Sequence, residues 1–388
     1  MTQIPLAWKN LTYDPRRLVV AVSGIAFAVV LMFQQRGFQH ALFDSTVEIV
    51  RELECDLVLL RPTRFALSVE TRFDRSLLDV AASHRGVVSA VPLYVENLGA
   101  RLRRENQKAR PIRVLAFDLD RPMLRDRTRE FASQRNLLDG PSTALMDRLS
   151  RSDYGFEFGS QALFPQTGEL NGRELHVVGT FTSGRDFAHT GNLIMSQENF
   201  ATYFTHRGLA PLQQVDLGLV KVDPQEDISQ VQQRLSETMG NEVSVLTKQA
   251  LIEREIALWD RSTPIGVIFT VGTLMGFVVG VIICYQVLAT AIADHLGEFA
   301  TLKAMGYSNG YFVRLTIQQS VYLAALGFLP GAVLSWVLFQ FNASFTALPM
   351  SMTLERVLVI LLATLVMCII SGMLALRKLF AADPASLF

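Results

Sequence analysis

The residues of this sequence with the clearest chemical pattern form a short polar segment between two long apolar runs. Ala293 to Gly306 reads ADHLGEFATLKAMG and carries acids, a histidine and a lysine. Glu298 and Lys303 are five residues apart, about 140° around a helix, so they are poorly placed to pair with each other. Both charges are available to a partner. The chemistry that this segment predicts is charge-based docking of another protein.

The sequence lacks the motifs of common catalytic sites. It contains no phosphate-binding GxxxxGK[ST] loop, no HExxH zinc motif, no paired Cys/His ligands and no GxSxG elbow. Its six histidines are scattered along the chain. We therefore expect a non-catalytic subunit that binds no cofactor and no metal, and that receives its energy from another protein. A membrane-embedded hydrolase is the enzyme alternative, but no nucleophile and base are visible.

Composition places part of the chain in a membrane. Half of the residues are apolar, 19% are charged, and the net charge is zero. Apart from the short cluster Arg101–Arg104, no run of basic residues is present, which argues against a nucleic-acid partner. The lipid bilayer is an expected partner.

Four apolar stretches are long enough to cross a bilayer, which takes roughly 20 residues. The expected transmembrane helices are residues 18–38, 261–288, 316–341 and 357–376, and residues 1–17 are expected to form an interfacial helix. The first stretch also resembles a signal peptide. Met32 to Arg36 lacks the small residues that cleavage requires, so an uncleaved anchor is favoured.

Basic residues in the short loops predict the orientation. Lys9, Arg16 and Arg17 precede the first stretch, whereas the loop 342–356 has only its terminal arginine. The positive-inside rule then places both termini, the loop 289–315 and the tail 377–388 on the cytoplasmic side of the membrane. Residues 39–260 and the loop 342–356 are expected on the outer side.

The large segment 39–260 is expected to be an extracytoplasmic α+β domain inserted between the first two transmembrane helices. Its predicted strands are 56–60, 87–95, 112–117, 174–181 and 215–222, and its predicted helices are 72–82 and 227–239. Thr247 is predicted to cap a further helix that leads almost directly into residue 261, as a stiff rod. Cys55 is its only cysteine, so no disulfide is expected within it.

Glycines line one side of the second apolar stretch. Gly272, Gly276 and Gly280 form consecutive GxxxG steps, with Gly266 before them, and such a stripe lets another helix backbone approach closely. The partner helix belongs either to the same chain or to a second copy in a homodimer.

The polar segment itself predicts an amphipathic helix. Ile292, Leu296 and Leu302 share one side, and Gly306 is placed to end the helix in a left-handed conformation. We expect the helix to dock a soluble partner protein through Asp294, His295, Glu298, Leu302, Lys303, Ala304 and Gly306. The alternative is a helix resting on lipid headgroups, but its polar side is acidic, whereas such helices favour Lys and Arg.

At these residues the chain resembles a known family. Glu298 to Gly306, EFATLKAMG, is similar to the E-x-x-x-x-K-A-x-G signature of FtsX/MacB-type ABC transporter permeases, and the match is closer to the DevC subgroup. Residues 263–269, 181–187 with Gly191 and Asn192, and the closing ADPA at 382–385 are also similar. His189 and Thr190 stand where the family pattern has a more acidic pair.

The resemblance implies the permease subunit of an exporter. Two copies would pair with two separate ATPase subunits, which would bind ATP and Mg²⁺, and the loop helices would carry ATP-driven motion to the periplasm. DevC relatives imply a membrane-fusion adaptor, an outer-membrane TolC-like channel, and efflux of a lipid or glycolipid. An FtsX-like regulator of an extracytoplasmic cell-wall hydrolase would share the loop signature and is the alternative.

Overall fold

The computed structural model describes residues 6–105, 107–121, 130–159, 162–184, 186, 189–346 and 350–381. The chain divides into two compact units. The helical unit comprises Met1–Ala41 and Thr263–Phe388, and the α+β unit comprises Leu42–Ser262. The closing motif at 382–385 lies outside the described residues, as do Arg185 and Phe187.

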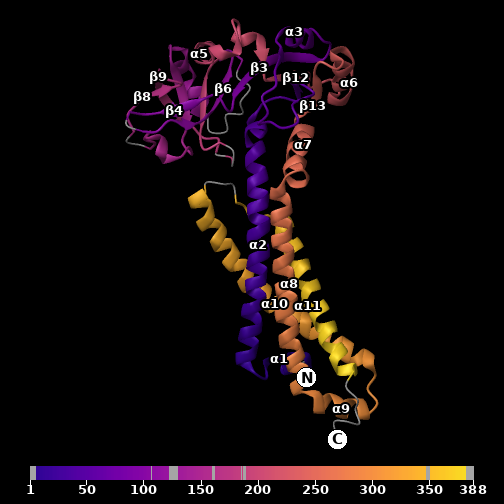
Figure 1. Cartoon of the computed structure of the whole chain (residues 1–388). Coiled ribbons are helices and arrows are strands. Elements are labelled where there is room, and N and C mark those ends of the chain that lie inside the picture. The colour runs from indigo at the N-terminus through magenta and orange to yellow at the C-terminus, as the bar shows by residue number, and fades with distance from the viewer. Residues whose placement is uncertain are drawn as a thin grey trace. The chain divides into compact units, whose positions relative to one another are not determined.

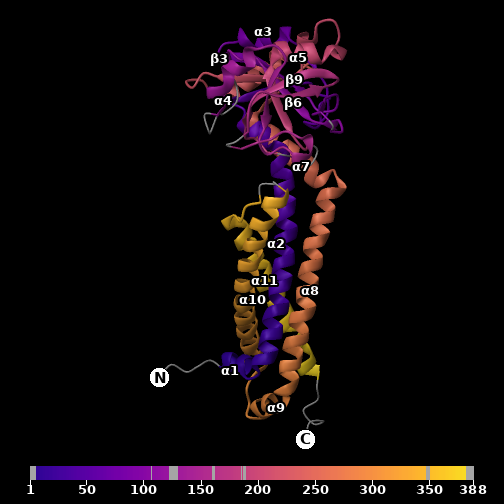
Figure 2. The same cartoon turned by 90° about the vertical axis from the view of Figure 1, so that its left-hand side faces the viewer.

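The helical unit is built from long apolar helices (Figures 1 and 2). Its elements are α1 (Leu6–Thr12), α2 (Pro15–Glu52, whose last part belongs to the α+β unit), α8 (Pro264–Asp294), α9 (Leu296–Ala304), α10 (Asn309–Thr346) and α11 (Leu354–Ala381). Four of the described helices, α2, α8, α10 and α11, are long and apolar enough to cross a membrane. Both views place α1 and α9 at the same end of this unit.

Two glycines on α10 hold its backbone close to α2. A Cβ added at Gly327 would lie 2.6 Å from the Cβ of Ile25, and one added at Gly331 would lie 2.8 Å from the Cβ of Val29. Such contacts are closer than any side chain allows, so only glycine fits at this crossing. The sequence shows the same GxxxG spacing here as in α8, but we did not predict a packing role for these two residues.

The helices extend beyond the apolar cores that hydropathy identifies. α2 begins at Pro15 and continues to Glu52 because Val47 and Val50, near its end, are buried in the core of the α+β unit.

The stiff rod predicted from Thr247 into the second apolar stretch is interrupted. α7 (Lys248–Arg261) ends before Thr263, whose backbone is extended (φ −118°, ψ 152°), and α8 begins at Pro264. Proline at the start of α8 is the arrangement expected for a first helical turn.

The α+β unit is built on one eleven-stranded sheet. Its strand order is β13-β1-β12-β3-β6-β10-β7-β9-β8-β4-β5, and β2 pairs with β11 separately. The strands are β1 (Leu57–Leu60), β2 (Phe73–Asp74), β3 (Val87–Glu96), β4 (Arg101–Arg103), β5 (Arg110–Pro111), β6 (Arg113–Phe117), β7 (Thr143–Asp147), β8 (Gln166–Leu170), β9 (Arg173–Phe181), β10 (Asn192–Ser196), β11 (Gln214–Val215), β12 (Leu217–Val222) and β13 (Ser244–Thr247). Most neighbours are antiparallel, but β6–β10 and β7–β9 are parallel.

Helices and short turns complete this unit. They are α3 (Ser76–Ala82), α4 (Glu130–Gln134), α5 (Gln197–Tyr203), α6 (Ile228–Met239) and α7, with the 3₁₀ turns η1 (Arg135–Asp139), η2 (Ser152–Tyr154), η3 (Thr205–Arg207) and η4 (Pro211–Gln213). Thr247 caps α7 by accepting a hydrogen bond from the Ala250 N–H at 3.0 Å, as predicted. Strand residues alternate between two apolar cores, one on each face of the sheet.

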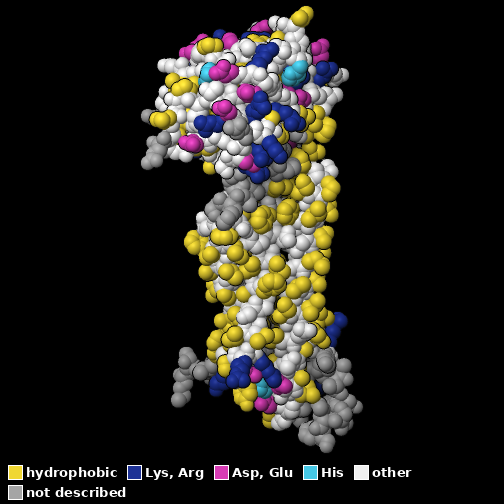
Figure 3. All heavy atoms as spheres, turned by 60° about the vertical axis from the view of Figure 1, so that its left-hand side comes forward, with side chains coloured by type: hydrophobic (Ala, Val, Ile, Leu, Met, Phe, Trp, Pro, Cys, Tyr) yellow, Lys and Arg dark blue, Asp and Glu magenta, His cyan; other side chains and the backbone are white. Residues whose placement is uncertain are grey.

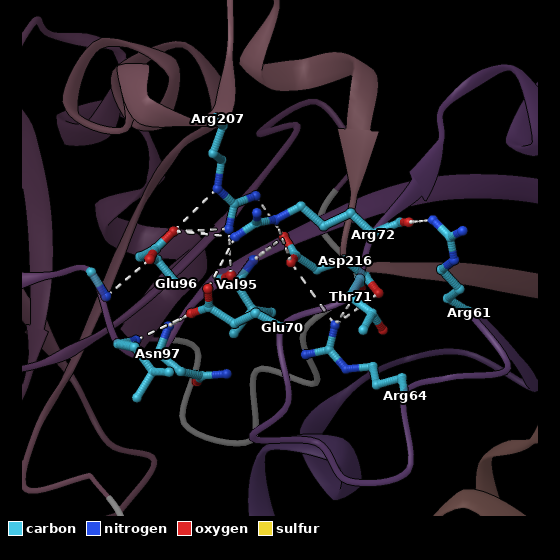
Figure 4. A network of polar contacts seen from close by, with 12 residues as sticks. Arg61, Arg64, Glu70, Thr71, Arg72, Val95, Glu96, Asn97, Arg207 and Asp216 are labelled. Atoms are coloured by element: carbon cyan, nitrogen blue, oxygen red, sulfur yellow. Dashed lines mark hydrogen bonds and ion pairs between the residues drawn. The ribbon is translucent and has the colours of Figure 1, made fainter.

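Charged side chains are buried in the α+β unit as a connected network (Figure 4). The Arg207 guanidinium donates to Asp216 at 2.7 Å and to Glu96 at 3.0 Å, and it lies 4.5 Å from the centre of the Phe200 ring. Arg64 donates to the Asp216 carbonyl at 3.1 Å. The network joins the loop before β2, the strand β3 and the turn η3, so its buried charges are paired with one another within the fold.

The three cysteines are free and buried. Burial raises the pKa of the Cys55 thiol to about 12. This side chain is therefore a protonated, unreactive thiol at neutral pH.

Candidate docking site at the loop between α8 and α10

The polar segment forms a short helix with a defined end. α9 follows α8 after the single residue His295 and ends at Ala304. The Tyr307 N–H donates to the Leu302 carbonyl and the Gly306 N–H to the Lys303 carbonyl, at 3.2 and 3.1 Å. Gly306 has φ +92°, which confirms the predicted left-handed ending. This hydrogen-bond pattern is the Schellman motif, and it turns the chain toward α10.

The side chains of α9 divide between the bundle core and the solvent. Leu302 is half-buried against the core of the helical unit, and Ile292 before it is buried. Glu298, Thr301 and Lys303 are exposed, and they are joined by Met305 and Tyr307, which follow the helix. The side chain of Ala304 lies outside the described residues. The exposed side therefore offers both charges and apolar contact area to a partner.

A second set of residues, from α1 and the start of α2, adjoins this segment. Arg17 forms ion pairs with Asp14 at 3.1 Å and with Asp294. His295 lies 3.2 Å from the Glu298 carboxylate, and Tyr13 stacks edge-on against its ring with a centroid distance of 5.7 Å. Figure 3 shows charged side chains gathered at one end of the helices, next to hydrophobic side chains that cover their length.

Sequence reasoning did not assign Asp14 or Tyr13 to this site, and it used Arg17 only to infer orientation. The residues at the start of α2 and those at the start of α9 are separated by some 280 residues of sequence, and no local sequence pattern connects them. Among the described residues, no group of three His, Cys, Asp or Glu side chains could hold a metal ion. The arrangement can bind a partner through charge and apolar contact.

The glycine stripe of α8 faces helices of the same chain. A Cβ at Gly272 would lie 2.6 Å from the Gln35 side chain, and one at Gly276 would lie 3.3 Å from Met32 Cγ, both on α2. A Cβ at Gly280 would collide with the Met367 sulfur on α11. Gly266 is also buried. In a single chain the stripe therefore serves close packing of α8 against α2 and α11.

The 181–192 segment of the α+β unit forms a second polar cluster. Arg113 donates to the Asp186 carboxylate at 2.5 Å and to the Asn192 side chain at 2.9 Å. His189 Nδ1 lies 3.0 Å from Asp186. Burial would raise the pKa of Asp186, but the charge of Arg113 and the hydrogen bonds from His189 outweigh it and hold this pKa at about 2. Asp186 is therefore an ionised structural partner at neutral pH.

Residues 270–384 match the family described as FtsX-like permease C-terminal. This match includes most of α8 and all of α9, α10 and α11. A comparison with curated protein sequences gave no significant match.

Two solved structures are similar to this chain. The periplasmic region of MacB from Actinobacillus actinomycetemcomitans aligns at 11% identity with a TM-score of 0.38, over 53% of this chain and 94% of the other. The extracellular domain of the noncanonic ABC-type transporter YknZ from Gram-positive bacteria aligns at 11% identity with a TM-score of 0.33, over 50% and 98%.

The family match covers the loop whose EFATLKAMG motif predicted the same assignment. Through residues 270–384, the chain carries a domain of the FtsX-like permease family.

Proposed function

We propose that this chain is the permease subunit of an ABC-type exporter and that α9 docks its separate ATPase. The observation that carries the proposal is the division of α9, with Leu302 held against the bundle core and Glu298, Thr301 and Lys303 exposed beside Met305 and Tyr307. A helix that packs against the bundle on one side and is exposed on the other can transmit a displacement from a bound partner to α8 and α10. The family match over residues 270–384 supports this role.

The interior of the helical unit supports transmission of motion rather than a polar channel. Its described buried polar side chains are glutamines and hydroxyls, with no charged group among them. Several hydroxyls bond within the bundle, as Ser371 does by donating to the Val281 carbonyl of α8 at 2.9 Å. A pathway for a charged cargo needs ionisable or hydrated groups. We infer that cargo does not cross between these helices.

The remaining features of the assembly follow from the resemblance to DevC-type permeases and from the loop charges. We propose that the α1–α9 end and both termini are cytoplasmic and that residues Leu42–Ser262 are inserted between the first two transmembrane helices on the periplasmic side. Two copies would pair with two ATPase subunits, which bind ATP and Mg²⁺. A membrane-fusion adaptor and a TolC-like channel would complete export of a lipid or glycolipid.

Charge reversal on α9 tests the docking role. We expect Glu298→Lys and Lys303→Glu to insert normally, but to lose co-purification with the ATPase and to abolish export, because a charge paired in a desolvated interface cannot be reversed without large cost. Glu355→Lys, an exposed reversal at the start of α11, is the matched control and should behave as wild type.

The outcomes separate the alternatives. Normal ATPase binding and export in both α9 variants would overturn the docking role. If the α9 variants lose ATPase binding, and the wild-type chain co-purifies with a cell-wall hydrolase and not with an adaptor, the chain would instead be an FtsX-like regulator.

A further inference from the structure

A cavity of about 510 Å³ lies between the corner formed by α1 and α2 and the corner formed by α8 and α9. Its volume falls within the roughly 300–1,000 Å³ of small-molecule pockets. Among its lining residues are Lys9 of α1, Arg17 and Leu18 of α2, Leu288 of α8 and Glu298 of α9. All of them belong to the helical unit.

The cavity changes from polar to apolar within one turn along both long helices. At the start of α2, Asp14 just before the helix and Arg17 within it are followed by Leu18 and Ala21. On α8 the order is reversed in sequence, because Leu288 and Ala291 precede Asp294. Both helices are apolar enough to span a membrane. The charged part therefore lies where a helix meets headgroups and the apolar part where it meets acyl chains, so an occupant must be amphipathic.

The charges of the polar part select the headgroup. The polar part is lined by two cationic side chains, Lys9 and Arg17, and by three carboxylates, Asp14, Asp294 and Glu298. Arg17 already pairs with Asp14 at 3.1 Å and with Asp294. A purely anionic headgroup that took Arg17 would leave these carboxylates unpaired, and a lone cation that took the carboxylates would leave Arg17 unpaired. A zwitterion carrying a phosphate and an ammonium group can match both sets. A primary ammonium donates three N–H bonds, whereas a quaternary ammonium donates none to a carboxylate.

We propose that this cavity binds an aminophospholipid of the phosphatidylethanolamine class. The phosphate is matched by Lys9 and Arg17, the ammonium by Asp14 and Asp294, and one acyl chain lies along Leu18 and Leu288. The lipid thereby ties the start of α9 to the corner of α1 and α2. The proposal depends on the helices crossing a membrane. It shares Asp294 with the proposed ATPase contact, but its tests use the chain without an ATPase, so a failure of one proposal is distinguishable from a failure of the other.

A headgroup series tests the proposal with the unmodified protein. The full chain is reconstituted in nanodiscs with equal amounts of phosphatidylethanolamine, phosphatidylcholine and phosphatidylglycerol of identical acyl chains, and the lipids retained in mild detergent are measured by native mass spectrometry. We expect about tenfold preference for the ethanolamine lipid over the choline lipid, the size expected for lost charged hydrogen bonds. Retention should fall stepwise through the mono-, di- and trimethylated ethanolamine lipids. A flat series, or a preference for phosphatidylglycerol, overturns the proposal.

A double variant tests the carboxylates. Asp14 accepts from the Arg16 N–H at 3.0 Å at the start of α2, and asparagine can cap in the same way, so Asp14→Asn keeps the helix start. Asp14→Asn with Asp294→Asn should abolish the preference for ethanolamine over choline. Glu355→Gln, outside the cavity, should retain it. An unchanged preference in the double variant overturns the assignment, and if that variant does not fold, the methylation series decides.

Discussion

Charged side chains occur in two opposite environments in this molecule. In the α+β unit, Arg207 and Asp216 are fully buried and bonded to each other and to neighbouring strands. At α9, Glu298 and Lys303 are exposed. A buried pair is held by the fold and is costly to disturb, whereas exposed charges contribute little to stability. Burial therefore separates the charges that maintain the structure from those available to a partner.

The largest expected effect tests the buried side of this contrast. Arg207→Met would remove the guanidinium that donates to Glu96 and Asp216 and leave them the more distant Arg72, at 3.7 and 3.3 Å. Breaking a buried pair costs about 3 to 5 kcal/mol, and we expect a loss at the lower end of this range. Unfolding of the full chain in detergent, followed by circular dichroism against urea, measures the loss. Arg103→Met is the control, because Arg103 pairs with Glu169 on the exposed surface, and we expect less than about 1 kcal/mol. Equal losses of unfolding free energy in the two variants would contradict the difference between buried and exposed charges.

The sequence predicted the elements of this fold better than their pairing. Apolar runs and turn residues identified the four long helices and the strands at 87–96 and 173–181. β7 and β10 were missed because each contains only three consecutive apolar residues, Ala144–Met146 and Leu193–Met195, which is shorter than the run of about four to eight that indicates a buried strand. The Arg64 to Asp216 bond joins residues 152 positions apart. No local signal predicts such a contact.

The predicted helix at 72–82 illustrates a second limit. Phe73 and Asp74 instead form β2 with β11, and the Asp74 carboxylate accepts from the Ser76 N–H at 2.9 Å, so α3 begins only at Ser76. At the candidate site, the α9 motif was visible in sequence because its residues are contiguous. Its contact with Arg17 depends on folding of the whole bundle.

The helices of the helical unit pack through buried glycines, whereas the α+β unit contains buried charges. A bulky residue at one of these glycines should therefore destabilise the helical unit. Gly276→Leu places a side chain against Met32, whose Cγ is 3.3 Å from the position of a Cβ, and overpacking costs about 1 to 3 kcal/mol. Val278→Leu, at an exposed position of the same helix, is the control. Thermal unfolding in detergent measures both. If Gly276→Leu is tolerated while cross-linked dimers disappear, the stripe packs between chains.

Acid should weaken the buried ion pair of Asp186. Its pKa is about 2 in the fold against an ordinary 3.8, so its contribution of about 2 kcal/mol is present above pH 4 and is lost as the pH falls toward 2. Asp186→Asn should remove this dependence. The measurement is the difference in urea midpoint between wild type and variant at pH 6 and pH 2.5, and a difference that does not narrow with acid would contradict the assignment.

The smallest effect concerns the two glycines of the α9 segment. Neither Gly297 nor Gly306 has an atom within 4 Å of an added Cβ, so alanine meets no clash at either position. They differ in backbone conformation, because Gly297 is helical and Gly306 has φ +92°. Gly306→Ala should destabilise the end of α9 by about 1 to 2 kcal/mol, whereas Gly297→Ala should stabilise the helix by about 1 kcal/mol. Hydrogen exchange of the α9 amides should then become faster in the first variant and slower in the second. Shifts in the same direction would show that the left-handed turn at Gly306 does not set the end of the helix, and the exposed side of α9 would lose its defined orientation toward a partner.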